Sequence, residues 1–169
     1  MSASPRGRLT PTPSVDIVQE SPLWQEQPGS DLVLRSAIAQ AAADLSTKQA
    51  ELAIVLTDDS RIRTLNRVWR GIDKPTNVLS FPAKNPGGKG ALALLGDIVI
   101  SYETTAEQAL AQGTPFLHHL AHLTVHGFLH LHGYDHAAED EAKAMEQLER
   151  VILARLDIPD PYAAREGSV

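Results

Sequence analysis

The 169-residue sequence contains no cysteine, and this absence excludes several classes of site at once. Disulfide frameworks, thiolate zinc fingers, iron–sulfur clusters and cysteine nucleophiles all need a thiol. No apolar run is long enough to cross a bilayer, and the two arginines near the start are not followed by the apolar stretch of a signal peptide. The simplest expectation is a cytoplasmic protein with no membrane contact.

The composition is that of a single globular domain. Hydrophobic residues make up 43% of the chain and charged residues 21%, which argues against disorder along most of its length. A chain of 169 residues can bury a substantial core but is short for two ordinary domains. Residues 1–13 contain three prolines and no periodic pattern, so we expect a flexible leader there and one domain over residues 14–169.

Positive charge is concentrated in one segment, although the formal net charge is −6. Seven of the 15 lysines and arginines lie between Arg61 and Lys89, where Asp73 is the only acid. Such a patch can bind a polyanion even on an acidic protein. It can equally be the solvated face of a helix, and charge alone does not decide between the two.

Hydrophobic periodicity and turn residues predict an α+β fold in which a sheet of about four strands packs with about five helices. Strands are expected at residues 15–18, 51–56, 76–81 and 96–101. Helices are expected at residues 31–45, 59–68, 103–111, 115–131 and 138–155. Three glycines and a proline within residues 85–90 predict a loop. The last helix is expected to expose an acidic face that includes Glu149.

All seven histidines fall between His118 and His136, a cluster that ordinary core or capping roles do not explain. His126 and His130 are four residues apart on a predicted helix, so their imidazoles share one face. Gly133 then allows a sharp turn with positive φ, which can bring His136 to the same point. Three histidines around one ion leave a fourth tetrahedral position open, which is typical of a catalytic zinc site.

The neighbouring residues are less informative. His122 lies one turn before His126, where it could support a ligand or contact substrate. Asp135 could orient an imidazole or simply form the turn. The sequence assigns no role to three other histidines, His118, His119 and His132.

The histidine spacing is also that of metzincin proteases, but the comparison argues against a peptidase. Those enzymes need a glutamate directly after the first histidine, as general base for the attacking water. The corresponding residue here is Gly127. The geometry of the metal site is therefore expected without the base that a peptidase uses.

The segment from His126 to His136, HGFLHLHGYDH, resembles the signature of the YbeY family of bacterial endoribonucleases at every specified position. Residues 65–82, LNRVWRGIDKPTNVLSFP, resemble a second block of the family, with Trp69 where tyrosine is more usual. Smaller matches at residues 95–98 and 160–162 extend the resemblance over about residues 15–165.

The resemblance implies an α+β fold in which His126, His130 and His136 hold one zinc ion per chain at the end of a helix. It also implies a single-strand-specific endoribonuclease acting in ribosomal RNA maturation, at the 3′ end of 16S rRNA, and in ribosome quality control. The family's functional arginine falls on Arg70, whose planar guanidinium can stabilise charge on a phosphorane-like transition state. Arg70 could instead cap the carbonyls of its own helix.

Single-stranded ribosomal RNA is the expected substrate, with Arg67 and Lys74 holding its backbone. The small ribosomal subunit, ribosomal proteins or a GTPase would fit as partners in maturation. Two other classes stay open: a metalloprotease-like hydrolase, and a zinc-stabilised, non-catalytic ribosome assembly factor. The number of protein ligands distinguishes the non-catalytic assembly factor from the two enzymes, because a zinc ion that serves stability alone normally has four protein ligands.

Overall fold

The computed structural model describes residues 12–47, 49–84 and 93–163. Most of the expected leader and all of the expected loop at residues 85–90 lie outside these ranges. The elements follow the order β1 (Ser14–Gln19), a 3₁₀ helix η1 (Pro22–Glu26), α1 (Ser30–Asp44), β2 (Ala50–Thr57), α2 (Asp59–Arg70), β3 (Val78–Pro82), β4 (Ala93–Ser101), α3 (Tyr102–Gln112), α4 (Phe116–Leu131) and α5 (Glu139–Arg155).

The strands form one sheet in the order β1-β2-β4-β3. Strands β1, β2 and β4 run parallel, and β3 is added antiparallel to β4 at one edge. Parallel neighbours need a crossover connection, which α1 supplies between β1 and β2. The edge strand β3 therefore lies next to α4, the helix that carries the histidines, with no further strand beyond it among the described residues.

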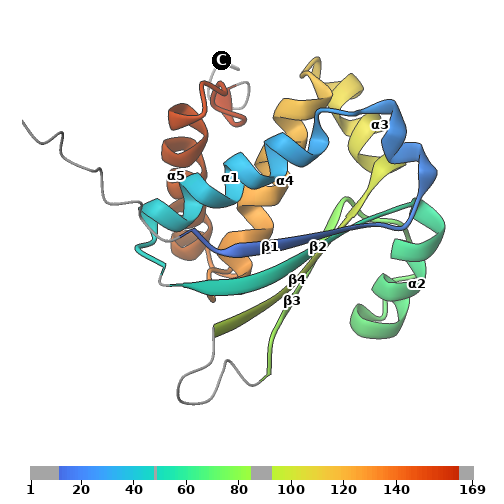
Figure 1. Ribbon diagram of the computed structural model, residues 1–169, viewed down its shortest axis with the longest axis horizontal. Coiled ribbons are helices and arrows are strands. Elements are labelled where there is room, and N and C mark those ends of the chain that lie inside the picture. The colour runs from blue at the N-terminus through green and yellow to red at the C-terminus, as the bar shows by residue number, and fades with distance from the viewer. Residues whose placement is uncertain (1–11, 48, 85–92, 164–169) are drawn as a thin grey trace, which may run out of the picture.

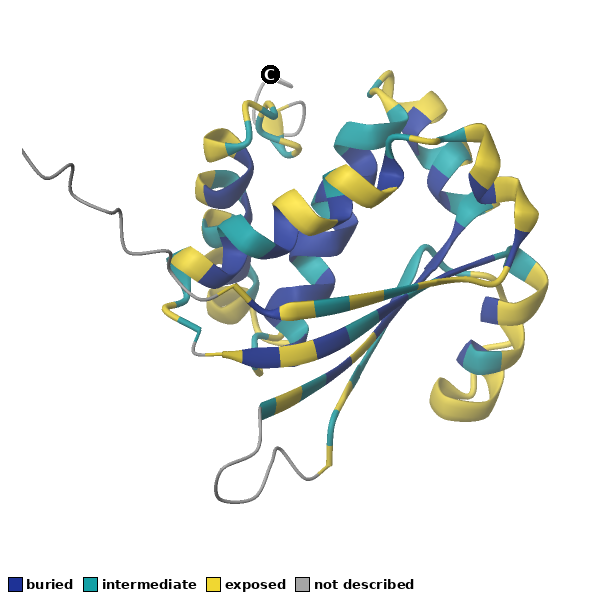
Figure 2. Cartoon of the chain, viewed as in Figure 1, coloured by how far each residue is buried: buried dark blue, intermediate teal, exposed yellow. Residues whose placement is uncertain are grey.

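The main core lies between the sheet and the helices above it (Figures 1 and 2). Buried and more exposed residues alternate along β2, so Leu52, Ile54 and Leu56 point toward these helices. Helix α4 is buried along most of its length, with Phe128 fully enclosed. The face of α4 that bears His126 and His130 remains partly accessible, and both residues are half-buried.

Helix α2 lies on the opposite face of the sheet, below it in Figure 1. Ile62 on this helix packs with Leu79 and Val99 in a second, smaller core. The outer surface of α2 is exposed, as Figure 2 shows. The last turn of α2 contacts the edge strand, because the rings of Trp69 and Phe81 pack edge to face.

The predicted α+β fold is confirmed, with four strands and five α-helices in the described ranges. The sequence pattern does not predict η1, because a five-residue 3₁₀ helix is too short to show periodicity. Its Trp24 is buried and donates an indole hydrogen bond to the Thr57 carbonyl at 2.9 Å. None of the helices in these ranges has the length and apolar character that crossing a membrane requires.

Candidate metal centre

Helix α4 and the turn after it bring three imidazoles together, as the histidine spacing predicts. His126 and His130 lie one helical turn apart, with their Nε2 atoms 3.0 Å from each other. Gly133 then adopts a φ of 89°, a conformation in which a side chain is strained, and the chain turns back. His136 arrives beside the other two, and its ring centroid lies 5.7 Å from that of His126 and 5.1 Å from that of His130.

The geometry and chemistry of this group fit a metal ion. One ligand atom from each of the three histidines lies within 4.8 Å of the others. Tetrahedral zinc with Zn–N bonds of about 2.0–2.1 Å separates its nitrogen ligands by about 3.3 Å, close to the spacing of the His126 and His130 Nε2 atoms. Burial lowers the pKa of His130, and the charge of the neighbouring His126 lowers it further. The lower pKa favours the neutral imidazole that a metal requires.

Glu149 on α5 supports this group from behind, and the expectation that it lies on an exposed acidic face is wrong. Its side chain is fully buried, and Oε1 lies 2.7 Å from Nδ1 of His126. Burial alone would raise the pKa of Glu149, but hydrogen bonds from His122 and His126 outweigh this effect and lower it to about 2. An ionised carboxylate at Nδ1 fixes the tautomer of His126 and leaves Nε2 free to bind a metal.

The second oxygen of Glu149 extends this hydrogen-bond network. It lies 2.6 Å from Nε2 of His122 and accepts a hydrogen bond from the Tyr162 hydroxyl. His122 therefore contacts the carboxylate that holds His126. One feature of the sequence does indicate that Glu149 is buried. It lies within the apolar stripe of the last helix, four residues after Met145 and three before Ile152.

Replacing Glu149 with glutamine is expected to lower Zn²⁺ affinity about 10–100-fold. Glutamine has only one acceptor oxygen, whereas the carboxylate of Glu149 serves two imidazoles and a hydroxyl. Competition against a chromogenic chelator measures the affinity. Glu141→Gln, on the exposed first turn of the same helix, is the matched control. Equal affinities for wild type and Glu149→Gln would show that this carboxylate does not hold His126.

A cleft of about 560 Å³ connects the three histidines to α2. Arg70, the last residue of α2, lines this cleft and is exposed. Its other walls come from the edge strand and the turn after α4, including Ser80, Tyr134 and Asp135. Arg70 and the three histidines therefore line one open cleft.

Two other basic residues from the sequence analysis lie outside this cleft. Arg67 lines a separate hollow, shared with Arg63 and Asp73 on the outer side of α2. Lys74 is exposed after the helix, and its carbonyl accepts a hydrogen bond from Asn66. If both bind RNA, they do so beyond the immediate surroundings of the histidines.

The remaining residues near the signature make structural contacts. His119 lies 2.9 Å from the Gln108 side chain, and burial lowers its pKa to about 4. His132 lies within hydrogen-bond distance of the Thr47 hydroxyl, away from the cleft. Asp135 accepts a hydrogen bond from the backbone N–H of His136, which supports the turn-forming alternative for this residue.

Gly127 lies where α4 packs closely on the sheet. A Cβ atom here would be 3.0 Å from Cγ2 of Ile98 and 3.1 Å from Oγ of Ser80. Ser80 also donates a hydrogen bond to the Gly127 carbonyl, at 3.1 Å. The packing therefore leaves little room for the glutamate that a metzincin protease carries at this position.

Gly127→Glu is expected to lower the free energy of unfolding by about 3 kcal/mol or more, because it forces bulk and a charge into a packed contact. Gly127→Ala should cost much less, because only a Cβ atom meets the tight contacts with Ile98 and Ser80, and the gain in helix propensity of about 1 kcal/mol offsets part of that cost. Urea unfolding followed by circular dichroism measures both. A Gly127→Glu protein with wild-type stability and peptidase activity would contradict this account of the site.

Comparison with known proteins identifies the family of this chain. The family model described as Endoribonuclease YbeY matches residues 24–157. Proteins named Endoribonuclease YbeY from Bradyrhizobium sp. strain BTAi1 and Rhodopseudomonas palustris strain BisA53 are 53% and 54% identical, over 163 and 159 residues. These matches cover 93% and 91% of this chain, and 96% and 92% of the relatives. The chain therefore belongs to the YbeY family.

Proposed function

We propose that this protein is a single-strand-specific, zinc-dependent endoribonuclease that acts in late ribosomal RNA maturation, at the 3′ end of 16S rRNA, and in ribosome quality control. The observation that carries this proposal is the cleft in which Arg70 faces the group of three histidines. The relatives named Endoribonuclease YbeY supply the reaction and the class of substrate. The catalytic domain extends over residues 14–169.

In this proposal His126, His130 and His136 hold one zinc ion. Zinc supplies Lewis-acid chemistry that stabilises negative charge on a phosphoryl oxygen. Glu149 keeps the His126 imidazole in one tautomer and orientation through its contact with Nδ1. The protein thereby fixes the ligand geometry before RNA arrives, so little reorganisation is needed during the reaction.

Arg70 acts from the opposite side of the cleft. Its planar guanidinium can donate to two phosphoryl oxygens at once, which a lysine ammonium cannot do in the same geometry. The end of α2 is held in place by Asn66, which is buried and donates a hydrogen bond to the Lys74 carbonyl at 2.9 Å. This contact closes the turn that follows Arg70 and limits how far the helix end can move.

Two alternatives receive less support. A metalloprotease would need a glutamate at Gly127, where the contact with the sheet is tight. A zinc ion that only stabilised an assembly factor would normally have four protein ligands and no cleft beside it. Here three histidines form the group, and they open onto the space lined by Arg70.

Arg67 and Lys74 are proposed to hold the RNA backbone outside the cleft. Their positions near the end of α2 fit a strand that enters from this side. The partners would be the small ribosomal subunit and its proteins or a GTPase, and the work would take place in the cytoplasm, where bacterial ribosomes mature.

The test is cleavage of a defined single-stranded RNA by zinc-loaded protein, with the same sequence as a duplex and casein as comparison substrates. We expect cleavage of the single strand only, because an A-form duplex does not present its backbone to a narrow cleft in the same way. Degradation of casein with the RNA left intact would overturn the proposal.

A further inference from the structure

A second hollow, of about 740 Å³, lies beside α2 on the face of the sheet opposite the main core. Its lining is largely apolar and includes the aromatic rings of two residues, Trp69 and Phe81, together with Val55, Leu65 and Val99. The two ring centroids lie 5.8 Å apart in an edge-to-face arrangement. Trp69 is nevertheless 62% exposed, so much of its side chain is accessible to a ligand.

This hollow adjoins the metal cleft across the edge strand β3. Ser80 and Pro82 on the edge strand line both spaces. The last turn of α2 also contributes to both, because Arg70 lines the metal cleft and its neighbour Trp69 lines the second hollow. A polymer held by Arg70 can therefore pass over the edge strand and reach Trp69.

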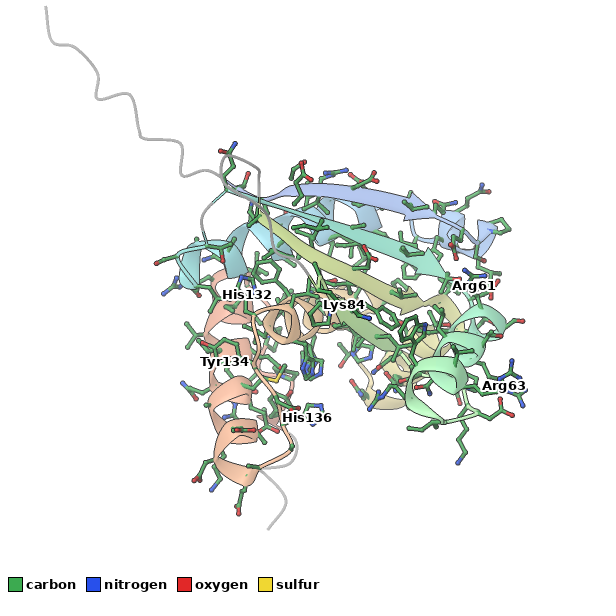
Figure 3. The ribbon with its side chains drawn as sticks, turned by 90° about the horizontal axis from the view of Figure 1, so that it is seen from below. Arg61, Arg63, Lys84, His132, Tyr134 and His136 are labelled. Atoms are coloured by element: carbon green, nitrogen blue, oxygen red, sulfur yellow. The ribbon has the colours of Figure 1, made fainter. Side chains whose placement is uncertain are left out.

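The polar groups of the hollow suit a nucleotide. Arg61 and Lys84 also line it, and Figure 3 shows them on α2 and at the end of β3. These cations can hold phosphates that flank a bound base. Two acids, Glu20 and Asp97, line it as well. Asp97 pairs with Phe81 across the β-ladder, where its carboxylate can accept hydrogen bonds from base amino groups.

We propose that this hollow is a subsite for one unpaired base of the RNA, which stacks on Trp69 while the scissile phosphodiester lies at Arg70. The inference rests on the proposed function and extends it. A base must leave its helical stack to enter the hollow, so the subsite gives a physical reason for selecting single strands. Trp69 is then a binding residue and takes no part in the chemical step.

Tryptophan fluorescence tests this proposal directly. The protein has two tryptophans, and Trp24 is only 2% exposed, so quenching by a ligand reports on Trp69. The probe is a single-stranded 2′-O-methyl oligoadenylate added to the zinc-loaded protein, with an abasic strand of equal length as comparison. We expect saturable quenching by the oligoadenylate and none by the abasic strand.

Substitutions provide the second arm. Trp69→Ala should weaken oligoadenylate binding roughly 5- to 150-fold, the range for the loss of one stacked base, and should raise KM for RNA with little change in kcat. Trp69→Phe should restore most of the affinity because it retains an aromatic face. Val68→Ala is the matched control, since Val68 is also exposed on α2 but does not line the hollow.

The outcomes separate this proposal from the proposed function. Unchanged RNA affinity and KM in Trp69→Ala would overturn the proposed subsite, as would equal quenching by the abasic strand and the oligoadenylate. Either result would indicate that the hollow binds a protein instead. Base-dependent quenching in a protein that cleaves no RNA would support the subsite and count against the nuclease assignment. A kcat for Trp69→Ala near that of wild type at saturating RNA shows that the neighbouring Arg70 is undisturbed.

Discussion

Replacing His130 with alanine is expected to remove stoichiometric zinc binding and, with it, RNA cleavage. Two imidazoles would remain, and two neutral ligands hold zinc poorly. The loss of affinity should exceed the roughly 10–100-fold effect of changing a group that only orients a ligand, such as Glu149. His126→Ala and His136→Ala should behave in the same way, because each removes one of the three converging nitrogens.

Elemental analysis of purified protein, together with chelator competition, measures this effect. His118→Ala is the matched control, because His118 lies on the same helix but lines a different pocket. It should retain one zinc per chain and wild-type cleavage. Equal metal content in wild type and in a variant lacking all three histidines would falsify the assignment.

The second large effect concerns Arg70, whose loss should lower turnover at saturating RNA by roughly 10²–10³-fold. This is the scale found when one donor to a developing oxyanion is removed. Zinc binding should not change, and RNA affinity should change much less than turnover, because the interaction grows in the transition state. Arg70→Lys should restore the charge without the bidentate geometry and remain well below wild type.

Arg67→Ala is the comparison for Arg70, since both residues are exposed in the last turn of α2 but only Arg70 lines the metal cleft. Arg67→Ala, like Lys74→Ala, should weaken binding and reduce the salt dependence by about one unit of slope. If Arg70 merely caps its helix, Arg70→Ala will melt at a lower temperature and turn over normally. Unfolding curves and single-turnover rates from one preparation distinguish the two roles.

The three histidines could be identified from sequence because their arrangement is local. An i, i+4 pair on one helix and a glycine at the turn determine most of the geometry, so eleven consecutive residues from His126 to His136 suffice. The order of the strands is a different case. Strand β3 lies at the edge of the sheet, antiparallel to β4, and this placement depends on packing between segments far apart in the chain.

Glu149 shows where sequence reasoning failed. It lies 23 residues from His126 and belongs to a helix rich in acids, so its charge suggested a solvated face. Only the packing of α5 against α4 reveals that this position is buried and that the carboxylate meets two imidazoles. The hollow at Trp69 could not be predicted from the sequence either, because it is assembled from α2, the edge strand and the open face of the sheet.

The most direct test of the account is a zinc titration of chelator-treated protein while cleavage of a single-stranded RNA is followed. We predict that activity appears in proportion to zinc and reaches its maximum at one equivalent per chain. His136→Ala should show neither binding nor cleavage over the same range. Full cleavage by the metal-free wild-type protein, or by His136→Ala without added zinc, would contradict the claim that the three histidines form the catalytic centre.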